Sequence, residues 1–93
     1  MATAIRLGRP LYTGAQVLAP RVTEALTETG TSQATTITAR QGEFAEITAI
    51  TNAVYANVNS AASASAWQVA VPVGGTGYIP ELAEGDAVTI ITV

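Results

Sequence analysis

Apolar and polar residues alternate with a period of two along much of this chain, as side chains do on the two faces of a β-strand. The residues that share an apolar face at this spacing are Ala45, Ile47 and Ala49 in one run, and Val54, Ala56 and Val58 in the next. Threonine, valine and isoleucine abound, and β-branched side chains pack well on a pleated surface. The pattern therefore predicts strands rather than helices.

The longest unbroken apolar face at this spacing lies in residues 67–73, with Trp67, Val69, Val71 and Val73. We expect this segment to form one strand whose apolar face belongs to the core. The spacing thus predicts that Trp67 is buried.

Turn-forming residues interrupt these runs at short intervals, around Gly30, Gly42, Asn52, Gly74 and Gly85. Strands are expected to centre on 3–7, 22–28, 34–39, 43–50, 53–58, 67–73, 76–80 and 86–92. The sequence predicts an all-β fold, a small antiparallel β-sandwich or barrel of about seven to eight short strands. Residues 59–66, rich in alanine and serine, are expected to form a flexible surface loop rather than a helical turn.

The first 21 residues differ from the rest in charge and in pattern. They hold three arginines and no acid, whereas residues 22–93 hold one arginine and all seven acids, a net charge of −6. Two prolines and little alternation indicate an extended N-terminal arm over 1–21 and a β-sandwich body over 22–93. The alternative is that 1–21 folds back as the first strand region of the same domain.

The composition excludes much chemistry. The chain has no histidine, lysine or cysteine, so the usual general base, Schiff-base amine and thiol nucleophile are absent. Glu43 and Glu46 are three residues apart and would face opposite sides of a sheet, which does not suit a catalytic carboxylate pair. We expect no enzyme, no catalytic residue and no cofactor.

Four arginines and a net charge of −3 also disfavour a nucleic-acid partner, since each phosphate contact draws on a cation. No apolar stretch is long enough to span a bilayer, and the N-terminus lacks an apolar segment of signal-peptide length. We therefore expect neither a nucleic-acid nor a membrane partner.

The stretch VPVGGTGYIPELAEGD, residues 71–86, gathers glycines and acids. A P-loop needs a lysine after its last glycine, and the spacing of GGTGYI does not match the dinucleotide fingerprint. We expect Gly74 and its neighbours to form a hairpin turn, and EGD to be a turn in which Gly85 takes a positive φ. Calcium binding by Glu81, Glu84 and Asp86 is the less favoured alternative, so no metal site is expected.

Contact residues are sought instead on the arm and among the five aromatic residues. Arg6 and Arg9 are expected to meet carboxylates of a neighbouring protein. Leu11 and Tyr12 would be exposed on an extended arm, and Tyr55 shares its strand face with Asn57 rather than with the core. The interface candidates are therefore Arg6, Arg9, Leu11, Tyr12 and Tyr55.

The order of the segments after residue 21 resembles that of small head decoration or accessory proteins of tailed bacteriophages. The resemblance rests on a threonine-rich pair of strands (VTEALTETGTSQATTITA), an alternating hairpin (EFAEITAITNAVYANV), a loop of small residues, and WQVAVPVGGTGYIPELAEGDAVTIITV. It covers about residues 22–93, and it assigns no site residues because such proteins act through surface fit.

The resemblance implies a non-enzymatic structural protein made in the host cytoplasm and carried on the virion, where it decorates or stabilises the capsid exterior. Its partner would be the major capsid protein or another virion protein, bound in multiple copies or as a homo-oligomer. The alternatives are a carbohydrate- or host-surface-binding β-module, and a neck or tail assembly component.

Overall fold

The chain folds as a two-layered β-structure, described here from a computed structural model for residues 2–11 and 18–93. Its strands are β1 (Ala2–Pro10), β2 (Leu18–Thr27), β3 (Gln33–Ala34), β4 (Phe44–Ala49), β5 (Val54–Val58), β6 (Val69–Val71), β7 (Thr76–Ile79) and β8 (Val88–Thr92). The described residues contain no helix, and hence none that is long and apolar enough to cross a membrane. The predicted all-β sandwich of about eight short strands is confirmed.

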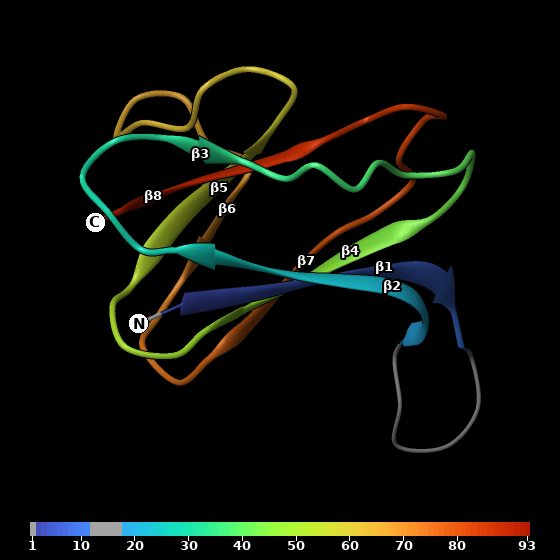
Figure 1. The fold of residues 1–93 in the computed structure, drawn as a ribbon, viewed down its shortest axis with the longest axis horizontal. Coiled ribbons are helices and arrows are strands. Elements are labelled where there is room, and N and C mark those ends of the chain that lie inside the picture. The colour runs from blue at the N-terminus through green and yellow to red at the C-terminus, as the bar shows by residue number, and fades with distance from the viewer. Residues whose placement is uncertain (1, 12–17) are drawn as a thin grey trace.

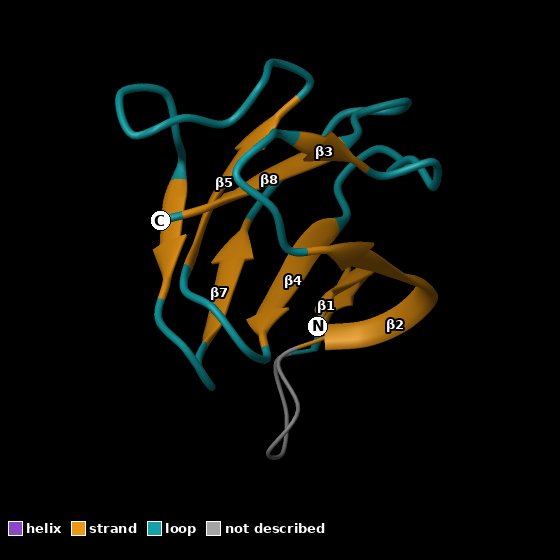
Figure 2. Cartoon of the chain, turned by 60° about the vertical axis from the view of Figure 1, so that its left-hand side comes forward, coloured by secondary structure: helices purple, strands orange, loops and turns teal. Residues whose placement is uncertain are grey.

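The strands form two antiparallel sheets of four strands each. The first sheet has the order β2-β1-β4-β7 and the second sheet the order β3-β8-β5-β6. Figures 1 and 2 show them as two facing layers, which the chain joins through several short connections. Each layer has an inner face toward the core and an outer face, and these names are used below.

The alternation seen in the sequence determines which side chains fill the core. Along β4, half-buried and buried residues alternate strictly. The buried ones are Ala45, Ile47 and Ala49, as predicted, and they have no exposed surface. In the second sheet, Val54 and Ala56 face the same core from the other side. The remaining core is supplied mainly by Ile5, Leu7, Leu26, Ala39, Val71, Ile79, Leu82, Val88 and Ile90.

The interpretation of residues 1–21 as an extended arm is wrong for the described part of that segment. β1 lies between β2 and β4, and its Ile5 and Leu7 have no exposed surface. The alternative, a first strand region, is what the structure shows. Pro20 lies in β2, an edge strand, opposite Gly8 where the register shifts, and prolines within sheets are confined to such edges and bulges.

One further expectation needs correction. Of residues 34–39 only Ala34 belongs to a strand, β3, and the residues after it keep only single backbone bonds to the last segment of the chain, such as Thr35 N–H to the carbonyl of Val88 at 2.9 Å. Residues 59–66 form a loop without a helical turn, as expected, and part of this loop packs against the body. Ala62 is 2% exposed, its amide donates to Ser32 Oγ at 3.1 Å, and Thr89 Oγ1 donates to the carbonyl of Ser60.

Candidate interaction surfaces

The outer face of the first sheet is polar, and its charges are paired with one another. Arg6 lies opposite Glu46, and Glu46 lies opposite Tyr78, across β1, β4 and β7. The Arg6 guanidinium is 3.2 Å from the Glu46 carboxylate, to which the Tyr78 hydroxyl also donates at 3.1 Å. Burial, the hydrogen bond to Glu46 and the charge of Glu46 all raise the pKa of Tyr78, so the phenol stays a neutral donor.

Arg6 thus meets a carboxylate of its own sheet, because antiparallel register places residues 6 and 46 side by side. That Arg6 meets a carboxylate of a neighbouring protein stays a prediction. An ion pair at this exposure contributes little to folding, on the order of 0–1 kcal/mol. It gives this face a hydrated, charge-balanced surface.

The outer face of the second sheet has a different character, because none of its four strands carries a charged residue. Tyr55 lies in register with Ile91 of β8 on one side and with Ala70 of β6 on the other. The Trp67 ring stacks on Tyr55, with 5.4 Å between ring centroids and 22° between planes. Tyr55 and Trp67, called the aromatic pair below, thus extend an apolar row across three strands.

The prediction that Trp67 is buried is wrong: the side chain is 46% exposed. The prediction assumed one continuous strand over 67–73, but the strand that forms is only Val69–Val71. Alternation holds within it, since Val71 is buried and Ala70 is exposed. It does not extend to the flanking residues, so Trp67 stacks on the outward-facing Tyr55 and Val73 is 58% exposed in the turn.

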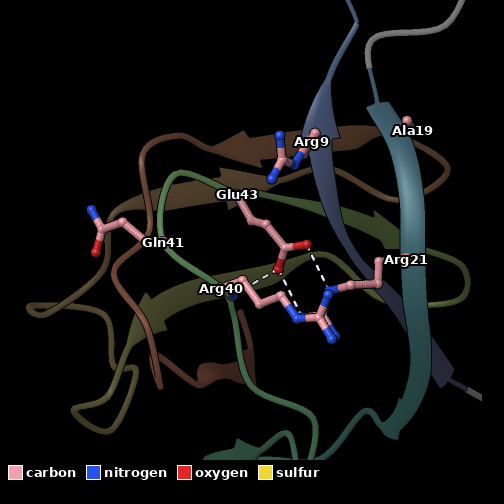
Figure 3. Close-up of a pocket in the computed structure, with 6 residues that line it drawn as sticks. All are labelled: Arg9, Ala19, Arg21, Arg40, Gln41 and Glu43. Carbon is pink, nitrogen blue, oxygen red and sulfur yellow. Dashed lines mark hydrogen bonds and ion pairs between the residues drawn. The ribbon is translucent and has the colours of Figure 1, made fainter.

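A pocket of about 190 Å³ lies where β1, β2 and the loop before β4 meet (Figure 3). Three of the four arginines of the chain line it. Its lining residues are Arg9, Ala19, Arg21, Arg40, Gln41 and Glu43, and we call it the arginine pocket. Figure 3 shows that these side chains come from three separate segments, so no sequence motif marks the pocket.

Glu43 is the anchor of this pocket. Only 3% of it is exposed, and its two oxygens accept hydrogen bonds from Nε and Nη2 of Arg21 at 2.7 and 2.8 Å. The backbone N–H of Arg40 donates to the same carboxylate at 2.8 Å. The hydrogen bonds from Arg21 lower the pKa of Glu43 against the opposing effect of burial, and the same pairing raises the pKa of Arg21. Both groups therefore stay ionised.

The other interface candidates fall at different places. Arg9 is exposed near the end of β1, and its side chain lines the arginine pocket. Leu11 follows β1 directly and is half-buried, while Tyr12 lies outside the described residues. Tyr55 is half-buried on the outer face of the second sheet. Among the candidates that the structure describes, Arg6, Arg9 and Tyr55 therefore lie on separate surfaces and not together on an arm.

Three further carboxylates fasten loops to the body, a role that the sequence analysis missed. Glu24 accepts the backbone N–H groups of Thr36 and Ile37 at 2.7 and 3.1 Å. Asp86 accepts the N–H of Ala83 at 2.8 Å. Glu28, 8% exposed, is the most enclosed of the three, and its partners are Thr3, Ile50 and Asn52.

Glu28 stays charged although it is enclosed. Burial alone would raise its pKa, but the hydrogen bonds from the Thr3 hydroxyl and from the backbone N–H groups of the 50–52 turn together outweigh burial, and the pKa is lowered. A single strand-end glutamate before a turn gives no sign of such contacts in the sequence. They depend on residues 3 and 50–52, which only the folded chain brings together.

The two glycine-containing stretches form the expected turns. Gly74 has φ of +75° in a turn closed by the N–H of Gly75 and the carbonyl of Pro72, and Gly85 has φ of +88°. The first turn does not close a hairpin, however, because β6 belongs to the second sheet and β7 to the first. Within residues 2–11 and 18–93, no group of three acidic side chains is arranged to hold a metal ion.

Comparison with protein-family models, with curated proteins and with solved structures finds no match to this chain.

Proposed function

We propose that this chain is a non-enzymatic structural protein of a bacteriophage particle, bound in many copies to the major capsid protein or another virion protein. The observation that carries the proposal is the outer face of the second sheet, whose strands hold no charged residue and whose centre is the aromatic pair. Decoration of the capsid exterior is the role that we favour.

The composition of this face supports a protein partner. The buried centres of protein interfaces are depleted in charged residues and enriched in aromatic ones, and tyrosine and tryptophan are frequent energetic centres. The only tryptophan of the chain is 46% exposed here, and Val93, at the end of the chain beyond β8, is 69% exposed. The opposite outer face, with its paired Arg6 and Glu46, serves as the hydrated side.

The edge of the second sheet adds a second route to contact. β6 is an edge strand of three residues, and the segment from Ile47 to Pro80 contains no charged residue at all. Soluble proteins commonly protect such edges with charges, because an open edge can pair with another strand. A neighbouring subunit that packs on the aromatic pair would also cover this edge.

Particle composition tests the proposal. Particles purified from the bacterial host that encodes the chain, separated into heads and tails, are analysed by quantitative mass spectrometry. We expect this chain in the head fraction, at a copy number comparable to that of the capsid subunits. Its absence from particles whose capsid proteins are detected would refute the proposal, and recovery with tails only would favour a neck or tail component.

A matched pair of variants connects the proposal to the surface. Trp67→Ala removes the exposed ring and is expected to reduce occupancy on particles at least about tenfold, as for an energetic centre of an interface. Thr23→Ala alters an exposed position on the first sheet and is expected to leave occupancy unchanged. Equal occupancy of both variants would exclude the second sheet as the contact surface.

The aromatic pair also favours a second candidate, a carbohydrate- or host-surface-binding module. Exposed tyrosine and tryptophan rings present flat apolar faces that can stack on sugars. The exposure of Trp67 supplies the aromatic surface that such a module needs. A glycan array with the purified protein tests this candidate: glycan binding that Trp67→Ala abolishes would support it, and no binding to any glycan would exclude it for the glycans displayed.

A further inference from the structure

The arginine pocket is lined by an excess of positive charge, whereas the chain as a whole is negatively charged. The chain carries a net charge of −3, but three guanidinium groups and a single carboxylate line this one pocket. Glu43 is fully engaged by Arg21 and by the backbone of Arg40, so it balances one guanidinium. The lining thus keeps two positive charges that the pocket itself does not neutralise.

Those two charges belong to Arg9 and Arg40. Both residues are exposed, and neither side chain makes a hydrogen bond or ion pair to any residue within 2–11 and 18–93. Arg40 is held in place by its own backbone, which donates to Glu43 and accepts from the N–H of Glu43 at 3.0 Å. Its side chain is therefore positioned at the pocket while its guanidinium remains available.

Gln41 lines the pocket as well, but its side chain points away from the two arginines (Figure 3). Its Oε1 accepts the backbone N–H of Glu84 at 3.4 Å, which directs the amide oxygen toward the 82–86 loop. The donors of this pocket that lack a matching acceptor are therefore the guanidinium groups of Arg9 and Arg40.

We propose that the arginine pocket binds a carboxylate, held by Arg9 and Arg40. The planar fork of a guanidinium matches the two oxygens of a carboxylate, and the pair Arg21–Glu43 shows that geometry within the same pocket. The source of this carboxylate rests on the proposed function: it is an aspartate or glutamate side chain of the neighbouring virion protein.

A carboxylate fits the pocket better than a phosphate does. Phosphate sites usually draw on a row of free backbone N–H groups, but the N–H groups of Arg40, Gly42 and Glu43 already donate within the protein. A phosphate would also bring close to two negative charges beside Glu43, and Glu84 lies near enough to act on Arg21. A singly charged carboxylate meets less repulsion.

Titrations of the isolated, ¹⁵N-labelled protein with propionate, a singly charged carboxylate, and with inorganic phosphate test the proposal, each at an ionic strength held constant with sodium chloride. We expect saturable amide shifts at residues 9 and 40–43 with propionate. Arg9→Gln and Arg40→Gln should each raise the dissociation constant at least about tenfold. Arg6→Gln is the matched control, because Arg6 is the one arginine outside the pocket.

Each other outcome overturns the proposal. Shifts that do not saturate, or that Arg6→Gln reduces as much as Arg9→Gln does, would show only general screening of charge. Tighter binding of phosphate than of propionate would overturn the assignment to a carboxylate. The test needs no particle, so failure of the pocket and failure of the virion proposal are separate results. Propionate binding by a chain that is absent from particles would retain the pocket and refute the virion proposal.

Discussion

Glu28 offers a sharp test of how the carboxylates hold this fold together. Each of its oxygens accepts two hydrogen bonds: Oε2 from Thr3 Oγ1 at 2.8 Å and from the N–H of Ile50 at 3.3 Å, and Oε1 from the N–H and Nδ2 of Asn52 at 3.0 and 3.3 Å. The substitution Glu28→Gln keeps the shape of the side chain. It removes the charge and replaces one acceptor oxygen with a donor N–H₂ group.

The expected cost follows from counting partners. The amide oxygen of glutamine can keep both bonds to Asn52, and the Thr3 hydroxyl can reverse to accept from the new N–H₂ group. The N–H of Ile50 is then left without its acceptor, and the remaining bonds lose their charge assistance. A bond to a charged group contributes about 1.5–3 kcal/mol, so we expect a loss of about 2 kcal/mol in the free energy of unfolding, or roughly 8–16 °C in Tm.

The dependence on pH identifies the cause. The pKa of Glu28 is lower in the folded chain than the ordinary value of 4.5, so its charged bonds stabilise the fold above about pH 4.5. That stabilisation is lost as the pH falls through the lowered, folded-state pKa. The difference in unfolding free energy between the wild type and Glu28→Gln should therefore be largest near pH 7 and shrink in acid.

Urea unfolding followed by far-UV circular dichroism, at neutral pH and at pH values below 4.5, measures this difference. Glu84→Gln is the control, because Glu84 is an exposed carboxylate, and its change should stay within about 0.5 kcal/mol. A loss for Glu28→Gln that equals that of the control, or that does not shrink in acid, would refute the role assigned to the carboxylate.

Three other predictions concern the strand, the tryptophan and the acidic turn. Leu7→Ala should lower the free energy of unfolding in urea by about 2–5 kcal/mol, because the Leu7 side chain in β1 is fully enclosed. A chain that folds normally without residues 2–10 would contradict the place of β1 in the core. Trp67→Ala should cost only about 1–2 kcal/mol, since about half of the ring is already exposed, and a loss above 3 kcal/mol would indicate a core position. Calcium should leave Tm unchanged, whereas an ion bound at 100 times its dissociation constant would add about 2.7 kcal/mol.

Most of the fold could be predicted because it depends on local pattern. The alternation of Ala45, Ile47 and Ala49 identified a strand with one enclosed face, and Gly74 and Gly85 marked turns that need a positive φ. These features are set by neighbours in sequence. The same reasoning overextended the strand at Trp67, where loss of sheet pairing outside Val69–Val71 ends the alternation.

What the sequence could not provide are contacts between distant segments. Ile5 and Leu7 have the spacing of a strand, but the arginines around them and the prolines after them favoured an arm over a central strand. The arginine pocket joins residues 9, 21 and 40, and Glu28 joins β2 to residues 3 and 50–52. One feature of the sequence did bear on the pocket. All side-chain cations of the chain are arginines, and arginine favours bidentate pairs with carboxylates, as between Arg21 and Glu43.

The proposed function makes the uncharged outer face of the second sheet the contact surface of this protein. Hydroxyl-radical footprinting of the free protein and of the protein bound on purified particles tests it most directly, since the two sheets supply their own comparison. We expect the oxidation of Tyr55 and Trp67 to fall several-fold on particles and the oxidation of Tyr78, on the first sheet, to be unchanged. Protection of Tyr78 with undiminished oxidation of Trp67 would contradict it.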